Sequence, residues 1–259
     1  MKKRALFFAF MLSSVLLTVH VKGRAETEGL PEGKTVSYSS DGEEVSGFLV
    51  VPEGKGPFPA IVVIHEWWGL NEQVKRKARE LAKEGYVTLA VDLYRGKVTD
   101  DPEEAHELLR GLPEDRAVRD LLSAVSYLKT LPNVKKDRIG SIGWCMGGGF
   151  SLSLAVNSPE LAACVVYYGR LITDREQLKR IKAPILGFFG EEDRGIPVSS
   201  VRAFEKTMKE LGKEVTVYIY PNAGHAFANE ERPSYNPEAA KDAWAKTLSF
   251  FEKTLKGAE

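Results

Sequence analysis

Short, uninterrupted runs of apolar residues recur along this chain, and helical stretches separate them. The first run, at residues 60–64, reads Ala-Ile-Val-Val-Ile and is too short for a helix. Such runs are typical of strands that are buried on both faces of a sheet. Because strands that alternate with helices pair in parallel, we predict one α/β domain, with a mostly parallel central sheet and helices on both faces. We expect a hairpin at residues 35–39 and 45–51, further strands at 86–91, 138–143, 161–168, 185–189 and 215–220, and helices at 74–84, 102–110, 114–130, 147–156, 198–211 and 237–255.

Residues 1–25 have the composition of an export signal. Lys2, Lys3 and Arg4 precede an apolar run at residues 5–19, and small residues at positions 23 and 25 suit a cleavage site. The run has about 15 residues, fewer than the ~20 that a membrane-spanning helix needs. We therefore expect cleavage, a mature domain at residues 26–259 that is periplasmic or secreted, and no stable membrane association afterwards. An uncleaved membrane anchor is the alternative.

The charge of the chain is unevenly distributed. The whole sequence has 36 basic and 36 acidic residues, a formal charge of zero. Residues 1–25 hold five of the basic residues and none of the acidic ones, so 31 basic and 36 acidic residues remain. A mildly acidic domain gives no general reason to expect nucleic acid as a partner.

A cysteine stands where an apolar run meets a helical stretch. The sequence from Gly143 to Gly147 reads Gly-Trp-Cys-Met-Gly, which is the nucleophile-elbow pattern with Cys145 in place of serine. Glycines two residues on either side allow a tight turn, and the helix that follows favours a thiolate at its N-terminus. We predict that Cys145 is a nucleophile; a buried structural cysteine in a glycine-rich loop is the alternative.

Two partners for this nucleophile follow it in the chain. Asp193 comes just after the run at 185–189, and His225 follows the last predicted strand. The order nucleophile, acid, histidine is that of α/β-hydrolases, in which the histidine takes the proton and the acid orients the imidazole. Glu192 is the rival for the acid, and His65 and His106 are weaker candidates for the base.

The second cysteine, Cys164, is predicted to be a free thiol like Cys145. The two cysteines lie near opposite ends of neighbouring parallel strands. These ends are separated by a strand length, roughly 17–20 Å. A disulfide needs Cα atoms within about 7 Å.

The segment after the first buried strand contributes to the same edge of the sheet. It reads His-Glu-Trp-Trp-Gly-Leu-Asn from His65 to Asn71. In α/β-hydrolases this loop supplies one oxyanion-hole amide and the residue after the nucleophile supplies the other. We therefore predict that the N–H groups of Trp67 and Met146 form an oxyanion hole, and that Glu66 places a carboxylate beside the site.

Six segments in order resemble the dienelactone hydrolase family, which includes carboxymethylenebutenolidases and has the α/β-hydrolase fold. The resemblance extends over roughly residues 45–255. Its segments are HEWWGLN at 65–71, AVDLYRG at 90–96, GWCMGG at 143–148, VVYYG at 165–169, FFGEED at 188–193 and AGHAFAN at 223–229. It implies a triad of Cys145, His225 and Asp193. It also implies that Glu66 contacts the resting thiol until substrate displaces the carboxylate.

The sequence departs from the family at two arginines that anchor a substrate carboxylate. Arg95 stands one residue before the position of the first arginine, and Asn229 occupies the position of the second. Arg232 substitutes for the second arginine only if its loop bends back. The export signal is a further departure.

These observations predict an enzyme that cleaves a lactone or carboxylic ester through an acyl-cysteine intermediate. A thioesterase or general carboxylesterase on the same triad, and a non-catalytic binding or thiol-sensor protein, are the alternatives. We expect substrate contacts from Arg95, Tyr94, Trp68 and Tyr168, although the aromatic residues also suit ordinary core packing. The spacing of residues suggests no metal or cofactor, and we expect a monomer or a weak homodimer.

Overall fold

The computed structural model describes residues 29–257, and residues from Pro31 onward form one packing unit. The export signal predicted at residues 1–25 lies outside the described residues. Within residues 29–257, none of the helices has the length and apolar character needed to cross a membrane.

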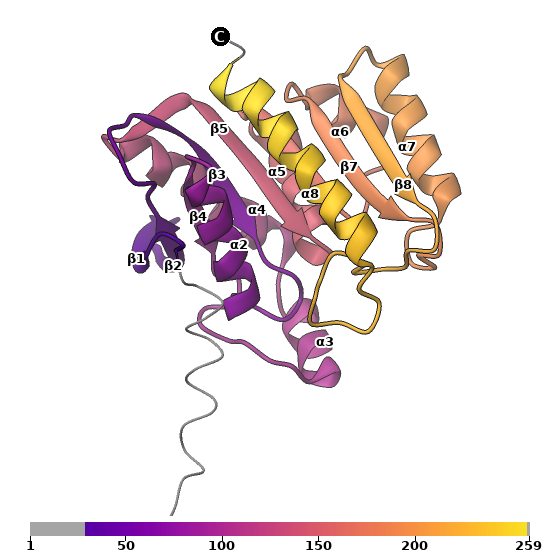
Figure 1. The fold of residues 1–259 in the computed structure, drawn as a ribbon, viewed down its shortest axis with the longest axis horizontal. Helices are drawn as coiled ribbons and strands as arrows, with labels where there is room; N and C mark the ends of the chain where they lie inside the picture. The colour runs from indigo at the N-terminus through magenta and orange to yellow at the C-terminus, as the bar shows by residue number, and fades with distance from the viewer. Residues whose placement is uncertain (1–28, 258–259) are drawn as a thin grey trace, which may run out of the picture. The chain divides into compact units, whose positions relative to one another are not determined.

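The unit is built on an eight-stranded sheet with the order β1-β2-β4-β3-β5-β6-β7-β8 (Figure 1). The first two strands form an antiparallel hairpin, and β2 pairs antiparallel with β4. All other pairs are parallel. The strands are β1 (Gly33–Ser40), β2 (Glu43–Val50), β3 (Phe58–Ile64), β4 (Val87–Val91), β5 (Val134–Trp144), β6 (Ala163–Tyr167), β7 (Ile185–Gly190) and β8 (Val215–Tyr220).

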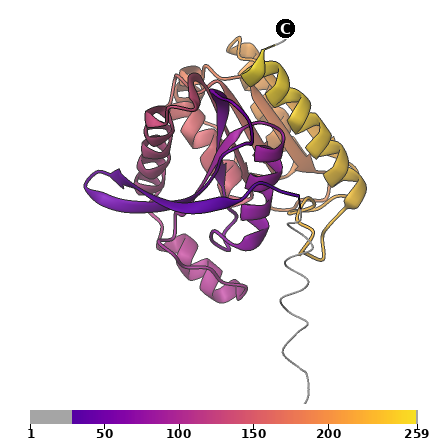
Figure 2. The same ribbon diagram turned by 60° about the vertical axis from the view of Figure 1, so that its left-hand side comes forward.

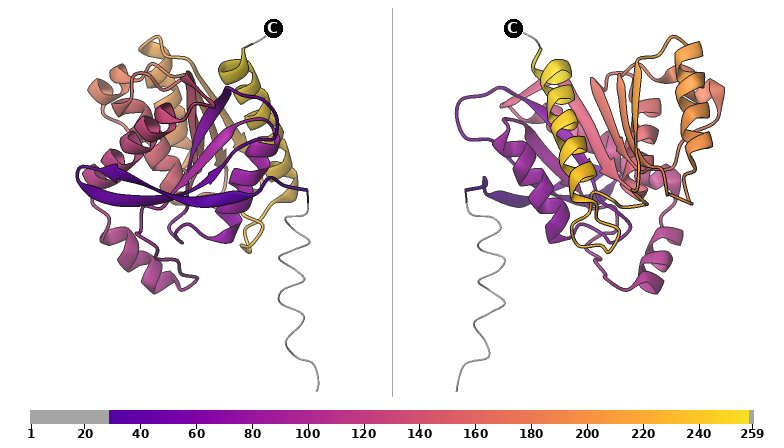
Figure 3. Two further views of the ribbon diagram at one scale, coloured as in Figure 1. Left: turned by 90° about the vertical axis from the view of Figure 1, so that its left-hand side faces the viewer. Right: turned by 45° about the vertical axis from the view of Figure 1, so that its right-hand side comes forward.

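Helices cover both faces of the sheet, as the uninterrupted apolar strands require (Figure 3). In β3, Val62 and Ile64 pack into one core with α4, α5 and α7, whereas Ile61 and Val63 pack into the other with α2 and α8. The predicted fold class, a mostly parallel α/β sheet between two helical layers, is confirmed. The helices are α2 (Glu72–Lys83), α3 (Pro102–Arg110), α4 (Glu114–Thr130), α5 (Met146–Asn157), α6 (Arg175–Arg180), α7 (Val198–Glu210) and α8 (Pro237–Phe251), which continues as a π-helical turn η1 (Glu252–Lys256).

The structure differs from the predicted elements in two places. The short helix α6 was not expected, because its only buried residue is Leu178 and one apolar residue gives no periodicity. Asp174 begins this helix by accepting the N–H groups of residues 176 and 177. Strand β5 also starts four residues before its predicted start, where exposed charged residues hide the strand pattern.

Parallel pairing brings several loops to one edge of the sheet. The arrowheads of β5, β7 and β8 point to this edge, and α3 lies beyond it (Figures 1 and 2). The loops that leave β3, β5, β7 and β8 at this edge carry Glu66, Cys145, Asp193 and His225.

The turn from β5 to α5 is the tightest of these connections. Cys145 has a φ of +53°, a conformation that favours glycine. A Cβ on Gly143 would lie 2.0 Å from the carbonyl oxygen of Gly147, and a Cβ on Gly147 would lie 2.3 Å from that of Ile64. The two glycines are therefore required so that strand β5, helix α5 and the end of β3 can approach one another.

We expect Gly143→Ala to lower the free energy of unfolding by about 3 kcal/mol or more, because the added methyl overlaps fixed backbone. Gly149→Ala in α5 is the matched control, since its Cβ would make ordinary contacts of 3.4–3.5 Å with Arg170. Urea denaturation of both variants measures the difference. Equal stabilities would show that the turn relaxes without cost.

Candidate active site

Cys145 lies at the centre of this edge, in the turn between β5 and α5. Its side chain is half-buried, and its N–H donates to the carbonyl of Tyr167 over 3.0 Å. The residue is the N-cap of α5, where the helix dipole favours negative charge. An accessible cysteine at a helix N-terminus is in a setting that promotes the nucleophilic thiolate.

The imidazole of His225 bridges Cys145 and Asp193. Its Nε2 lies 3.1 Å from the Cys145 Sγ, and its Nδ1 lies 2.7 Å from the Asp193 Oδ2. Three residues from three separate loops are thus within hydrogen-bonding distance in the order thiol, imidazole, carboxylate. This is the geometry expected of a nucleophile, its base and the group that orients the base.

The carboxylate of Asp193 is held on both oxygens. Oδ1 accepts the N–H groups of Gly195 and Ile196 at 2.9 and 3.1 Å, while Oδ2 contacts His225. Burial raises the pKa of Asp193, but the hydrogen bonds from His225 and these amides outweigh it and lower the pKa overall. Glu192, the rival acid, is exposed, and it is Asp193 that accepts the hydrogen bond of His225.

The same contacts favour the protonated form of His225. Partial burial lowers the pKa of His225, whereas the hydrogen bonds and charges of Asp193 and Cys145 raise it, to about 10 overall. At neutral pH the imidazole therefore carries a proton that it can give to a leaving group.

The other two histidines of the described residues have different surroundings. His65 is fully buried, where its Nδ1–H donates to the carbonyl of Glu66 and its Nε2 accepts the N–H of Leu93. Burial lowers the pKa of His65, so it remains neutral and links two loops. His106 in α3 packs its ring edge against Trp67, with ring centroids 4.8 Å apart.

The side chain of Glu66 is buried, and two side chains hydrogen-bond to its carboxylate. Tyr168 donates its hydroxyl to Oε1 over 3.2 Å, and Asn229 donates its amide to Oε2 over 2.8 Å. Burial raises the pKa of Glu66, although these hydrogen bonds and the charges of His225 and Arg232 oppose the rise.

The surroundings of Glu66 differ from what the family resemblance implies. Its two oxygens hydrogen-bond to Tyr168 and Asn229, while the hydrogen-bond partner of the Cys145 thiol is His225. Asn229 reaches one of the Glu66 carboxylate oxygens through its side-chain amide. The thiol and the imidazole are already paired in this structure.

The predicted oxyanion-hole amides lie on the same wall as the thiol. Trp67, Cys145 and Met146 line one cavity together. Among residues 29–257, neither the Trp67 N–H nor the Met146 N–H has a backbone or side-chain acceptor. Both donors are therefore available for a substrate oxygen.

Two cavities meet at Cys145. The larger, of about 540 Å³, is bounded by α3, α5 and the segment that leads into α6. The smaller, of about 390 Å³, contains His225, Glu66, Trp68 and Arg232. Trp67 and Cys145 line both cavities, so the thiol lies where they join.

The aromatic residues expected to contact substrate divide into two groups. Trp68 lines the smaller cavity. Tyr94 and Tyr168 line neither cavity, because their hydroxyls face Met146 Sδ at 3.2 Å and Glu66 Oε1 respectively. These two tyrosines contact the site residues Met146 and Glu66 through their hydroxyls.

Arg95, which we expected to contact the substrate, forms its ion pairs outside the two cavities at Cys145. Its guanidinium pairs with the fully buried Asp120 at 2.8 Å and with Glu43 at 3.3 Å, and it lines neither cavity. A buried carboxylate needs such a partner, so Arg95 has a structural role between the 92–96 loop and α4.

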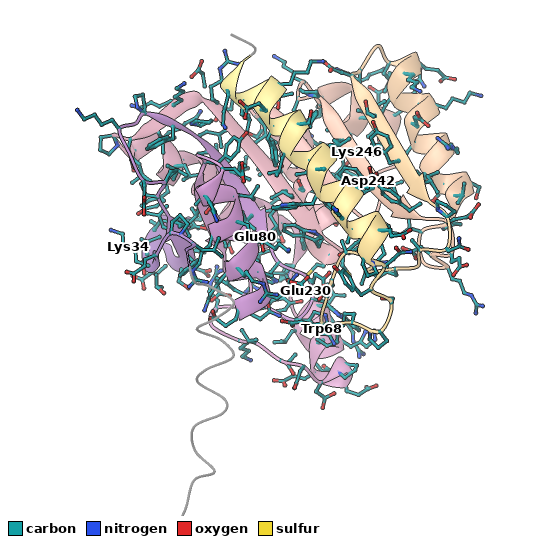
Figure 4. The ribbon with its side chains drawn as sticks, in the orientation of Figure 1. Lys34, Trp68, Glu80, Glu230, Asp242 and Lys246 are labelled. Carbon is teal, nitrogen blue, oxygen red and sulfur yellow. The ribbon has the colours of Figure 1, made fainter. Side chains whose placement is uncertain are left out.

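Arg232, in contrast, bends back into the site. Its guanidinium carbon lies 3.6 Å from the ring centroid of Trp68, and the residue lines the smaller cavity. The loop that carries it is held to α2 through Glu230, which pairs with Arg76 and lies 3.9 Å from the Lys77 Nζ. Figure 4 shows the side chains of the molecule in the orientation of Figure 1, with Trp68 and Glu230 labelled.

Sequence reasoning missed most of the wall of the larger cavity. Phe150, Leu171, Ile172 and Gln177 line it, from α5 and from the segment that ends in α6. These residues belong to no motif, and only the fold brings them beside Cys145. In the part of the chain that the structure describes, His, Cys, Asp and Glu side chains form no group of three that is suited to hold a metal ion.

Comparisons with known proteins show the family to which the chain is similar. The model of the dienelactone hydrolase family matches residues 45–255. A protein of Methylorubrum extorquens named "Putative carboxymethylenebutenolidase" is 34% identical over 242 residues, covering 88% of this chain and 83% of the relative.

Solved structures show the same likeness. A dienelactone hydrolase-like promiscuous phosphotriesterase from metagenomic libraries superposes with a TM-score of 0.80 at 26% identity, covering 87% of this chain and 99% of the other. The dienelactone hydrolase of Anabaena variabilis has a TM-score of 0.67 at 25% identity, with 87% and 99% covered.

We expect Asp193→Asn to lower the pKa of His225 from about 10 towards its ordinary value of 6.5, since the carboxylate that stabilises the imidazolium is lost. The sign follows because a neutral amide favours the proton less than an anion does. A pH titration of the His225 ring by NMR measures the shift. Glu192→Gln is the control and should leave the titration unchanged; an equal shift in both variants would remove Asp193 from this role.

We expect Arg95→Ala to reduce stability by about 3 kcal/mol, because it leaves the carboxylate of Asp120 buried without a partner. The same variant should keep its KM for a carboxylated lactone. Arg232→Ala is the counterpart and should raise that KM several-fold. Steady-state kinetics and urea denaturation of both variants make the comparison, and a raised KM in Arg95→Ala would restore its predicted substrate contact.

Proposed function

Because the chain belongs to the dienelactone hydrolase family of carboxylic ester hydrolases, we propose that it cleaves a lactone or carboxylic ester through an acyl-cysteine intermediate at Cys145. The observation that carries this proposal is the hydrogen-bonded series of Cys145, His225 and Asp193, with distances of 3.1 and 2.7 Å.

Acylation begins when the Cys145 sulfur attacks the ester carbonyl, after the thiol proton has passed to His225. The carbonyl oxygen becomes an oxyanion, which accepts hydrogen bonds from the free N–H groups of Trp67 and Met146. When the tetrahedral intermediate collapses, the C–O bond breaks and the imidazolium protonates the leaving alkoxide. The acyl group is then a thioester of Cys145.

Deacylation uses the same groups in reverse. His225 takes a proton from water, the resulting hydroxide attacks the thioester, and Cys145 leaves as a thiolate that the imidazolium stabilises. Asp193 holds the Nδ1–H throughout, so that Nε2 always faces the reacting atoms. A thiolate leaves a tetrahedral intermediate more readily than an amine does, which favours esters and lactones over amides.

Glu66 is placed to act beside this series. It is one of the residues that line the smaller cavity with Cys145 and His225. Its two oxygens hydrogen-bond to Tyr168 and Asn229, while the thiol pairs with His225. We therefore expect the free enzyme to react with thiol reagents without any substrate to displace Glu66.

We expect Cys145→Ala to lower kcat for p-nitrophenyl acetate by at least about a thousandfold, because the nucleophile is lost. Cys164→Ala is the matched control. Cys164 is fully buried beside Ser151, and burial raises the pKa of Cys164 to about 11. The Cys164→Ala variant should retain the activity, and in the unmodified protein iodoacetamide should label Cys145 alone.

This pair of variants also separates an enzyme from a binding or thiol-sensor protein. A sensor would show the same labelling of Cys145 but no turnover. Full activity in Cys145→Ala would contradict the proposed nucleophile.

A further inference from the structure

The larger cavity at Cys145 has a group of apolar side chains in its wall, and His225 is not among its lining residues. Leu109 of α3, Phe150 of α5, Leu171 and Ile172 line it together with Met146. Leu109 is 36% exposed, and the other four are only partly buried. These side chains therefore present apolar surface to the space beside the thiol, where an apolar group would be removed from water.

The charged residues at this cavity lie at its mouth. Glu114, Arg170 and Asp174 line it and are exposed. The carboxylate of Asp174 accepts two N–H groups as the N-cap of α6. These three charged groups thus face solvent, whereas the buried Ser153 and the partly buried apolar side chains form the less exposed part of the wall.

The position of His225 decides which half of an ester enters which cavity. The imidazole must protonate the leaving alkoxide, and it lines only the smaller cavity, with Arg232 and Glu66. The leaving group therefore lies on that side. The acyl carbon is bonded to Cys145 in the intermediate, and Cys145 and Met146 are both part of the wall of the larger cavity.

We propose that the larger cavity binds the acyl group, so that the preferred substrates are esters of apolar carboxylic acids of about six to eight carbons. This inference rests on the proposed acyl-cysteine mechanism and adds the substrate class to it. A volume of about 540 Å³ is within the range of small-molecule sites. It is ample for an unbranched acyl chain of this length.

The first test is the chain length of p-nitrophenyl esters, in which the leaving group is constant. Each methylene that enters an apolar site contributes about 0.8 kcal/mol, which corresponds to roughly a fourfold change. We expect kcat/KM to rise about threefold to fourfold per methylene from acetate to hexanoate. A flat or falling series would overturn the proposal.

The second test reverses the ester while keeping its atoms. S-ethyl thiooctanoate and S-octyl thioacetate are isomers whose leaving thiolates have similar basicity. If the larger cavity takes the acyl chain, kcat/KM should be at least tenfold higher for S-ethyl thiooctanoate. Equal values, or a preference for S-octyl thioacetate, would place the chain on the leaving-group side and overturn the proposal.

The third test fills the cavity. Ser153 of α5 lines it, and no described group bonds its hydroxyl, so Ser153→Phe extends a ring into the space. We expect the octanoate-to-acetate ratio of kcat/KM to fall at least tenfold. Ser126→Phe, at an exposed position of α4 that lines neither cavity, is the control and should keep the wild-type ratio.

A second variant covers the possibility that Ser153→Phe does not fold. Leu109→Asp changes an exposed residue of α3, so it should leave the core intact while placing a charge at the cavity wall. It should lower the same ratio at least tenfold. An unchanged ratio in a folded variant overturns the acyl site, whereas the absence of any Cys145-dependent hydrolysis of p-nitrophenyl acetate would overturn the proposed function as well.

Discussion

The close approach of strand β5, helix α5 and the end of β3 is the constraint on which the rest of the site depends. It is possible only because Gly143 and Gly147 have no Cβ, since a methyl at either position would lie within 2.3 Å of backbone oxygen. The approach keeps Cys145 in a conformation with φ of +53° and raises its thiol above the sheet at the N-terminus of α5. The cost in backbone strain is local, and the two cores on either side of the sheet support it.

A parallel sheet then brings the remaining groups to this thiol. The loops after β7 and β8 leave the same edge, so Asp193 and His225 meet although 31 residues separate them. Each member of the series stabilises the next: backbone amides hold Asp193, Asp193 holds the imidazole, and the imidazole pairs with the thiol. Asp193 and Cys145 together raise the pKa of His225 to about 10, so the shift does not come from a single residue.

The surroundings of the thiol are asymmetric, and the asymmetry is chemical as well as spatial. On one side lie Glu66, His225 and Arg232, three groups that carry or exchange charge. On the other side lie apolar side chains from α3, α5 and the segment before α6, together with the exposed Glu114, Arg170 and Asp174. A reaction that creates an alkoxide on one side of the thiol and leaves an acyl group on the other matches this division.

The sequence by itself determined the sheet and singled out Cys145, His225 and Asp193 as the candidate nucleophile, base and acid. Uninterrupted apolar runs and the spacing of glycines are patterns of a few neighbouring residues, so the sequence alone shows them. The order of Cys145, Asp193 and His225 along the chain is visible in the same way. Only the tertiary structure decided where long side chains point. Arg95 turns to the buried Asp120, Arg232 turns inward onto Trp68, and the Glu66 carboxylate accepts hydrogen bonds from Asn229 and Tyr168. These outcomes depend on partners 25 to more than 160 residues away in the chain, and no local pattern records which of several polar partners a buried charge will find.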